Sequence, residues 1–476
     1  MNELVAFALL VGLAWGAVFV LRGSIVVGGL SVLLASCCFG YFFVHFALGP
    51  LPMTIDRLLL GLLIAAYVVQ RALRRTDPKP MHAADWLTAA LVGYLLLNML
   101  SSDWRTVQKG DISPLWRWFG GYFAPLVLYW GAKQAPWTER TSNLVPACLT
   151  AFGLYLAVTA LCEIAHLWAF VFPSYIADPK VGLHFGRARG PMVHGVSYVH
   201  YQGVCLPAAR LTASRLRGRA RATNIGLLPL FAAGVYFSYT RSVWMGAGLG
   251  LCTLFCTTLR GRTRSLVLGG VAAAALIVGA TQMEKIVGFQ REQSAADTAD
   301  SANLRVSFAY VSWLMFQDRP LFGFGFGRFP GDKLPYLADR SSELHLEALR
   351  PSVPHHTFLR PLAYTRQEEQ KKNLAMLAAR IVKAWRTYAA SDASDGARRR
   401  AILLLGAVGV YAPQLLFHEL SYTLVDNALV FFLAGASSAA ATARSAVVRP
   451  RRAEVVSPRS VDESYAVRSS SVLAPS

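Results

Sequence analysis

Residues 223–259 read TNIGLLPLFAAGVYFSYTRSVWMGAGLGLCTLFCTTL, two apolar runs that meet at one arginine, Arg241. Each run is close to the length that a helix needs to cross a bilayer. Basic clusters flank the far ends of both runs, namely RLTASRLRGRAR (210–221) and RGRTR (260–264). Because short basic loops face the cytoplasm, Arg241 is predicted to lie at the opposite, outer surface of a membrane.

Arg241 is therefore the first candidate functional residue. An ionisable side chain at membrane depth is costly, and such residues usually mark a substrate, ion or proton pathway. A long basic side chain can also anchor a helix at the interface, with its charged end among the headgroups. Both interpretations, a functional arginine and an interface anchor, remain open from this stretch alone.

The composition of the whole chain agrees with a membrane protein. Of its 476 residues, 54% are hydrophobic and only 16% are charged. A soluble domain carries roughly a quarter charged residues, so this chain has too little polar surface for water. The net charge of +20 lies mostly in short loops and the C-terminal tail, where it orients helices and meets anionic lipid headgroups. A nucleic-acid partner is not predicted.

Apolar segments of near-spanning length recur along the chain and predict an all-α, polytopic membrane protein of about 12 transmembrane helices. One large outer region, from about 283 to 400, contains no run apolar enough to span. The predicted parts are an N-terminal set of transmembrane helices (1–168), helices that carry outer-face arginines (169–282), a periplasmic catalytic loop with a surface helix (283–400), a C-terminal transmembrane pair (401–440) and a disordered basic tail (441–476).

The outer region has its own pattern. Leu304, Phe308, Val311 and Met315 recur at helical spacing, which predicts an amphipathic helix that stops at the Asp-Arg-Pro sequence 318–320. The glycine-aromatic run LFGFGFGRF (321–329) follows this helix instead of a strand, so a nucleotide-binding loop is not predicted. We expect a turn whose aromatic side chains rest on the membrane surface.

The segment 359–390, LRPLAYTRQEEQKKNLAMLAARIVKAWRTYAA, is too basic to be predicted as a lipid-spanning helix. It is expected to form a polar stretch and a helix that lies on the surface. The basic sequence GARRR (396–400), however, favours a cytoplasmic position before the next apolar run. A cytoplasmic position would demand a crossing before residue 396 that no apolar run supplies, so either a span has been lost or the topology near the C-terminus is unusual.

Four patches, in this order, resemble the O-antigen ligase and Wzy-type polymerase superfamily of bacterial membrane glycosyltransferases. They are RARGPMVHG (187–195), YTRSVWMG (239–246), RVSFAYVSWLMFQDRPLFGFGFGRF (305–329) and HHTFL (355–359). The terminal pair of apolar runs, with LLFHEL (415–420) between them, fits as well. The resemblance covers roughly 180 to 440, and the first half of the chain resembles the family only by topology.

The resemblance implies an inverting transfer of a glycan from undecaprenyl diphosphate to an acceptor hydroxyl, without metal or other cofactor, at the periplasmic face of the bacterial inner membrane. Such a reaction needs cations that hold the diphosphate. A guanidinium suits this task because it stays ionised and binds phosphate oxygens in pairs. Arg241 and Arg189 are the matching positions, with Arg187 as the substitute. For Arg189, a solvated loop charge beside Arg187 is the alternative.

The reaction also needs a base for the acceptor hydroxyl, and an imidazole with a pKa of about 6.5 suits it near neutral pH. His355 matches the family histidine, and His356 stands where the family has an asparagine. Either residue fits the role, and a structural histidine that caps the following helix is the alternative. Arg305 resembles a family position that could bind glycan hydroxyls, although a polar-face arginine on an amphipathic helix needs no further reason.

Neither a metal site nor the acceptor follows from the sequence. No pair of outer histidines has the i, i+4 spacing with an adjacent glutamate, and no D-x-D motif occurs. The acceptor can be lipid A-core (a ligase), another lipid-linked glycan (a Wzy-type polymerase) or a protein (an O-oligosaccharyltransferase). A lipid-linked glycan transporter is the alternative from another class, but no internal repeat supports it.

Overall fold

The computed structural model describes most of the chain. It describes residues 12, 14–48, 51–76, 78–101, 104, 113–183, 185–259, 261–273, 295–319, 324, 326, 328–339, 344, 346–350, 367–418 and 424–447. Within these ranges it does not describe the side chains of residues 47, 48, 51, 241, 295–303, 305, 330, 367–377, 416, 417 and 440–447.

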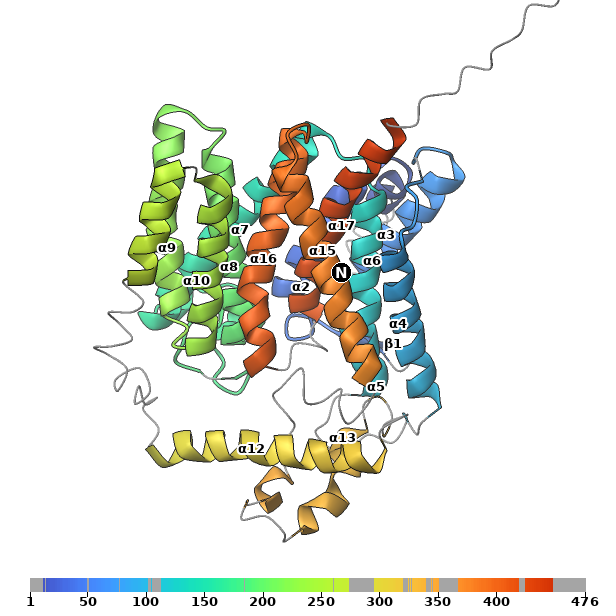
Figure 1. Cartoon of the computed structure of the whole chain (residues 1–476), viewed down its shortest axis with the longest axis vertical. Coiled ribbons are helices and arrows are strands. Elements are labelled where there is room, and N and C mark those ends of the chain that lie inside the picture. The colour runs from blue at the N-terminus through green and yellow to red at the C-terminus, as the bar shows by residue number, and fades with distance from the viewer. Residues whose placement is uncertain are drawn as a thin grey trace, which may run out of the picture.

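Most helices stand side by side in one bundle (Figure 1). They are α2 (Ile25–Cys38), α3 (Ile55–Ala72), α4 (Ala83–Leu100), α5 (Pro114–Trp118), the π-helix η1 (Phe119–Phe123), α6 (Ala124–Gln134), α7 (Glu139–Ile164), α8 (Gly195–Ala213), α9 (Gly218–Tyr236), α10 (Arg241–Thr258), α15 (Gln367–Ala389), α16 (Asp395–Phe417) and α17 (Leu424–Val447). One antiparallel hairpin joins β1 (Phe46–Leu48) to β2 (Leu51–Met53). The predicted all-α class is confirmed for the described residues.

A separate layer lies across one end of the bundle. The long helix α12 (Ala295–Asp318) runs crosswise there, beside α13 (Phe329–Asp332) and the short 3-10 helices η5 (Leu334–Ala338) and η6 (Leu346–Leu349) (Figure 1). We call this end of the bundle the α12 end. The opposite end carries the basic segments 210–221 and 396–400 and is called the basic end.

Two of the described helices, α4 and α7, are long and apolar enough to cross a membrane. Three shorter stretches are also apolar: Ile25–Cys38, Ser242–Thr258 and Leu424–Ala439. Large hydrophobic side chains face outward around the bundle, among them Leu97, Val158 and Met245, which are 67%, 47% and 58% exposed. Apolar surface of this extent indicates a lipid or protein environment. The figure of about 12 crossing helices remains a prediction.

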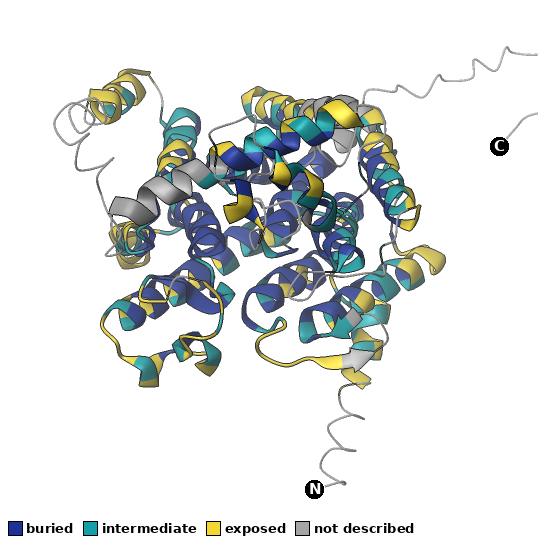
Figure 2. Ribbon diagram, turned by 90° about the horizontal axis from the view of Figure 1, so that it is seen from below, coloured by how far each residue is buried: buried dark blue, intermediate teal, exposed yellow. Residues whose placement is uncertain are grey.

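The buried residues lie between the helices and the exposed ones face outward (Figure 2). Small residues allow the closest helix approaches, as is common in membrane bundles. Gly409 of α16 lies against Gly250 of α10, and an added Cβ on Gly435 of α17 would overlap the backbone oxygen of Tyr129 in α6. A larger residue at Gly435 would therefore separate α6 from α17.

Helix α15 differs from the expectation of a surface helix. It stands upright in the bundle and packs against α4, α16 and α17 (Figure 1). Its Arg380 is buried. The guanidinium lies 4.3 Å from the ring centre of Tyr129 and donates to Thr88 Oγ1 at 2.5 Å. These partners on neighbouring helices compensate the charge of Arg380. From composition alone, such charges had argued against a spanning helix in this segment. Helix α15 runs along the bundle and returns the chain to the basic end.

The predicted amphipathic helix is confirmed in α12, which ends at Asp318 as expected. Its residues Phe308, Val311 and Met315 are buried, and Leu304 packs against the same cluster. Their partners are not lipid but the small helices of the same layer, through Phe329, Leu337, Leu346 and Leu349. The layer consequently has a hydrophobic core of its own.

The glycine-aromatic run also differs from its prediction. Phe326 does not rest on a membrane surface but is buried against Leu91, Leu95 and Met99 of α4. Its amide nitrogen donates to Asn98 Oδ1 at 2.6 Å, and its ring meets Tyr122 edge-on. The phenylalanine therefore attaches the crosswise layer to the bundle.

Candidate functional site

Four helices bring polar side chains together at the α12 end of the bundle. The chain enters α8 and α10 at this end, leaves α16 there and enters α17 there (Figure 1). Ser242, next to Arg241 in the first turn of α10, lies with its Oγ 2.6 Å from Nε2 of His418. His418 caps α16 and belongs to the LLFHEL segment. Ser242 of the segment 239–246 and His418 of the LLFHEL segment are therefore neighbours in space.

A buried polar chain connects α8 to the first turn of α17. Nδ1 of His194 lies 3.0 Å from Oγ of Ser197, which donates to Asp426 Oδ2 at 2.7 Å. The other carboxylate oxygen of Asp426 lies 3.1 Å from Nδ1 of His200. His200 and Asp426 are fully buried, so these contacts are shielded from solvent.

The sequence explains how this chain of contacts forms. Positions 194, 197 and 200 are three apart and share one face of α8. Asp426 stands in the first turn of α17, where the positive end of the helix dipole favours a carboxylate. Nε2 of His200 is buried and has no hydrogen-bond partner among the described residues.

Arg189 lies elsewhere, inside the loop between α7 and α8. Its Nη1 donates to the carbonyl of Val181 at 2.7 Å and its Nη2 to that of Ile176 at 2.8 Å. Its backbone nitrogen and that of Gly190 both donate to the carboxylate of Glu163. The Arg189 side chain is only 1% exposed, and burial lowers the pKa of its guanidinium.

In this structure the Arg189 guanidinium is directed at its own loop, and diphosphate binding by Arg189 stays a prediction. Both terminal nitrogens of its guanidinium are already bound to backbone oxygens. Nor is Arg189 the solvated loop charge that was the alternative, because it is buried and holds the loop 165–193 together. Arg187, the substitute position, is partly exposed.

Replacing Arg189 with alanine should therefore lower the stability of the folded protein more than the rate of the reaction. Its loss leaves the buried carbonyl of Ile176 without this donor, at about 1–3 kcal/mol, and removes the donor of the part-buried carbonyl of Val181. We expect a lower thermal unfolding midpoint of the purified protein for Arg189→Ala, and a smaller decrease for Arg187→Ala, because Arg187 is only partly buried. Equal midpoints for Arg189→Ala and the wild type would contradict the structural role of Arg189.

The other predicted site residues are described in part or not at all. Arg241 is the first residue of α10 and Arg305 belongs to α12, but neither side chain is described. His355 and His356 lie outside the described residues. The backbone of Arg241 lies at the α12 end, directly before Ser242 in the first turn of α10.

The sequence did not single out Asp426 or Ser197, and His194 and His200 were only among the outer histidines that lack metal-binding spacing. A signal was present for the carboxylate, because Asp426 is the one charged residue in the apolar run 421–440. The three polar positions on one face of α8 were a weaker signal. Among the described residues, no group of three or more histidine, cysteine, aspartate or glutamate side chains is placed to hold a metal ion.

A cavity of about 480 Å³ opens in the crosswise layer, next to the end of α4. Arg319, Arg328 and Asp332 line it together with the rings of Phe324 and Tyr336. Burial raises the pKa of Tyr336 to about 12, and the hydrogen bond to Asp318 adds to the shift, so its hydroxyl stays protonated. Guanidinium, carboxylate and aromatic groups together suit a polar ligand with many hydroxyls.

Part of the chain matches a known protein family. Residues 226–363 match the O-antigen ligase family. The resemblance to the O-antigen ligase and Wzy superfamily is thereby confirmed, and the matched stretch contains YTRSVWMG, α12 and HHTFL. Proteins of this family are bacterial integral membrane proteins with ligase- or polymerase-type glycan transfer in surface polysaccharide assembly. No curated protein matches the chain.

Proposed function

We propose that this protein transfers a glycan, with inversion and without metal, from undecaprenyl diphosphate to an acceptor hydroxyl. The observation that carries the proposal is the family match over residues 226–363, which includes Arg241, Arg305 and both candidate bases. The enzyme would act in the bacterial inner membrane, with its site at the α12 end facing the periplasm.

The proposed reaction forms one bond and breaks one. The acceptor oxygen attacks the anomeric carbon, and the bond from that carbon to the diphosphate oxygen breaks. The hydroxyl proton passes to His355 or His356, and the electron pair leaves with undecaprenyl diphosphate. Arg241 and Arg187 would hold the diphosphate and stabilise the charge that develops on it.

The buried chain at the α12 end would position this machinery. Asp426 contacts Ser197 and His200 on α8. Ser242, the residue that follows Arg241, contacts His418. These contacts fix the start of α17 against α8 and the start of α10 against the end of α16, which would hold Arg241 in place. A site built on packed helices keeps its geometry better than one on loops alone.

The cavity beside α4 would bind the glycan. Its arginines and aspartate match the hydroxyl groups of a sugar, and its aromatic rings match the apolar faces. Arg305 on α12 would add a further contact. The acceptor would be lipid A-core; another lipid-linked glycan or a protein hydroxyl would make the enzyme a polymerase or an O-oligosaccharyltransferase.

The direct test supplies the purified protein with a lipid-diphosphate glycan and a candidate acceptor. We expect free undecaprenyl diphosphate to appear in step with the glycosylated acceptor, both measured by mass spectrometry. A transporter would instead move the intact donor across a vesicle membrane. Donor translocation with no diphosphate release would refute the enzyme.

Metal removal gives a further expected result. Since arginines would take up the charge of the leaving diphosphate, turnover should persist in excess EDTA at the rate seen without it. The measurement is the initial rate of diphosphate release. Loss of activity under EDTA that a divalent cation restores would overturn the metal-free mechanism.

A further inference from the structure

A second cavity, of about 600 Å³, lies at the basic end of the bundle, far from the α12 end. The ends of α8, α10 and α15 and the start of α16 surround it. Its polar lining consists of Arg210, Ser214, Thr257, Thr258, Tyr388, Ser391 and Arg398. A volume of this size suits a small ligand or a lipid headgroup.

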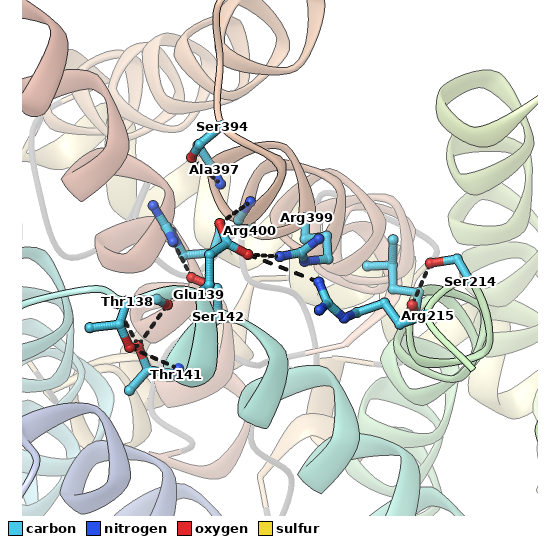
Figure 3. Close-up of polar contacts among 12 residues, drawn as sticks. Thr138, Glu139, Thr141, Ser142, Ser214, Arg215, Ser394, Ala397, Arg399 and Arg400 are labelled. Carbon is cyan, nitrogen blue, oxygen red and sulfur yellow. Dashed lines mark hydrogen bonds and ion pairs between the residues drawn. The ribbon is translucent and has the colours of Figure 1, made fainter. Parts of the chain in front are cut away.

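The arginines of this cavity differ from the other arginines at the basic end. Glu139 accepts hydrogen bonds from Arg399 at 2.5 Å and from the Gly396 backbone, and it lies 3.9 Å from Arg215 (Figure 3). Arg400 donates to Ser142 Oγ and to the carbonyl of Ala436. Glu139 does not line the cavity, and no other carboxylate is among the described residues that do.

Arg210 and Arg398 lack such compensation. The Arg210 side chain has no hydrogen bond or ion pair among the described residues, although it is partly buried. Arg398 donates to the carbonyls of Ala390 and Ser391, both through Nη2, and its buried Nε has no partner in the described part of the chain. Two guanidinium groups with free donor capacity around one cavity favour an anion, and a phosphate most of all.

The hydroxyl groups of the cavity add a second requirement. Tyr388 donates to the carbonyl of Thr257, Thr258 donates to that of Leu254, and Ser214 donates to that of Leu211. Their protons are therefore committed to the backbone, and their oxygens keep lone pairs that can accept. The cavity offers donors for a phosphate and acceptors for hydroxyl protons.

We propose that this cavity binds the phosphate ester of a polyol, such as the headgroup of phosphatidylglycerol or a free glycerol phosphate. The phosphate lies between Arg210 and Arg398, and the polyol donates to Thr258, Tyr388 and Ser214. The bound group links the ends of four helices, two of which, α8 and α10, carry residues of the α12 end. The site is independent of the proposed glycan transfer.

The test measures ligand-dependent thermal unfolding of the delipidated, full-length protein in detergent. The probes are dioleoylphosphatidylglycerol, dioleoylphosphatidic acid, dioleoylphosphatidylcholine and sn-glycerol 3-phosphate. We expect phosphatidylglycerol to raise the unfolding midpoint and phosphatidylcholine to leave it unchanged. A response to phosphatidylglycerol alone assigns a lipid ligand, and a response to glycerol phosphate as well assigns a soluble one. No response to either probe would overturn the proposal.

Two matched variants separate a built site from general surface charge. Arg210→Gln should weaken the phosphatidylglycerol response by roughly tenfold to a hundredfold in concentration, as expected for a lost charge-assisted hydrogen bond. Arg219→Gln removes the same charge from an exposed position on α9 that does not line the cavity, and it should respond as the wild type. Equal losses in both variants would refute the site.

A third variant tests the polyol. Thr258→Val keeps the shape of the side chain but removes its acceptor oxygen. We expect it to weaken the response to phosphatidylglycerol several-fold while the response to phosphatidic acid, which has no polyol, stays unchanged. If the wild-type protein responds equally to the two lipids, the assignment of a polyol is wrong.

Discussion

Replacing His355 with alanine is expected to lower the rate of glycan transfer by about 10²–10⁴ while donor binding survives. An acceptor hydroxyl has a high pKa, so its proton must leave as the oxygen attacks. His355 matches the family histidine, whereas His356 stands in place of an asparagine whose task is orientation. The measurement is single-turnover release of undecaprenyl diphosphate, with donor affinity measured separately.

His356→Asn is the matched control and should be tolerated, because it restores the residue type of the family motif. The wild-type rate should fall on the acid side of neutral pH, since a protonated imidazole cannot accept the hydroxyl proton. If His355→Ala stays active and His356→Ala does not, the alignment is shifted by one residue. If both variants stay active, histidine is not the base and the mechanism loses its main support.

The sequence predicted those elements whose pattern is local. The spacing of Phe308, Val311 and Met315 identified α12 and its buried face, because a helical period depends only on near neighbours. The same pattern does not say what the face packs against. Its partners, Phe329 and Leu337 among them, come from the segment that follows α12 and not from lipid.

Helix α15 shows where composition misleads. Its basic residues predicted a surface helix because each charge was considered without its partners. Arg380 is instead shielded by the rings of Tyr129 and Phe431 and by the hydroxyl of Thr88, which belong to three other helices. Compensation by residues far away in the sequence is a tertiary effect, and the count of charges in one segment cannot reveal it.

Arg189 and Asp426 make the same point for the site. Arg189 looked like a phosphate ligand because of its motif, yet its guanidinium is bound to the carbonyls of Ile176 and Val181. Asp426 looked like one polar residue in an apolar run, yet it joins α17 to Ser197 and His200. A residue type sets the chemistry that is available, and the fold decides which partner uses it.

Replacing Arg241 with lysine is expected to abolish most of the transfer while the protein still inserts into the membrane and folds. Lysine keeps the positive charge but offers no paired donors for phosphate oxygens. One such contact to a developing charge is worth of order 3 kcal/mol, so a loss of roughly a hundredfold in rate is expected. The measurement is diphosphate release per folded protein, with the unfolding midpoint recorded for each variant.

The matched control is Arg262→Lys, the same change at an exposed position in the helical segment 261–273. It should leave the rate unchanged, because only the site of diphosphate binding requires a planar, bidentate hydrogen-bond donor. An Arg241→Lys protein with the wild-type rate would show that positive charge alone suffices there. Arg241 would then be an interface anchor, and the diphosphate would have to be bound by Arg187 or by another residue at the α12 end.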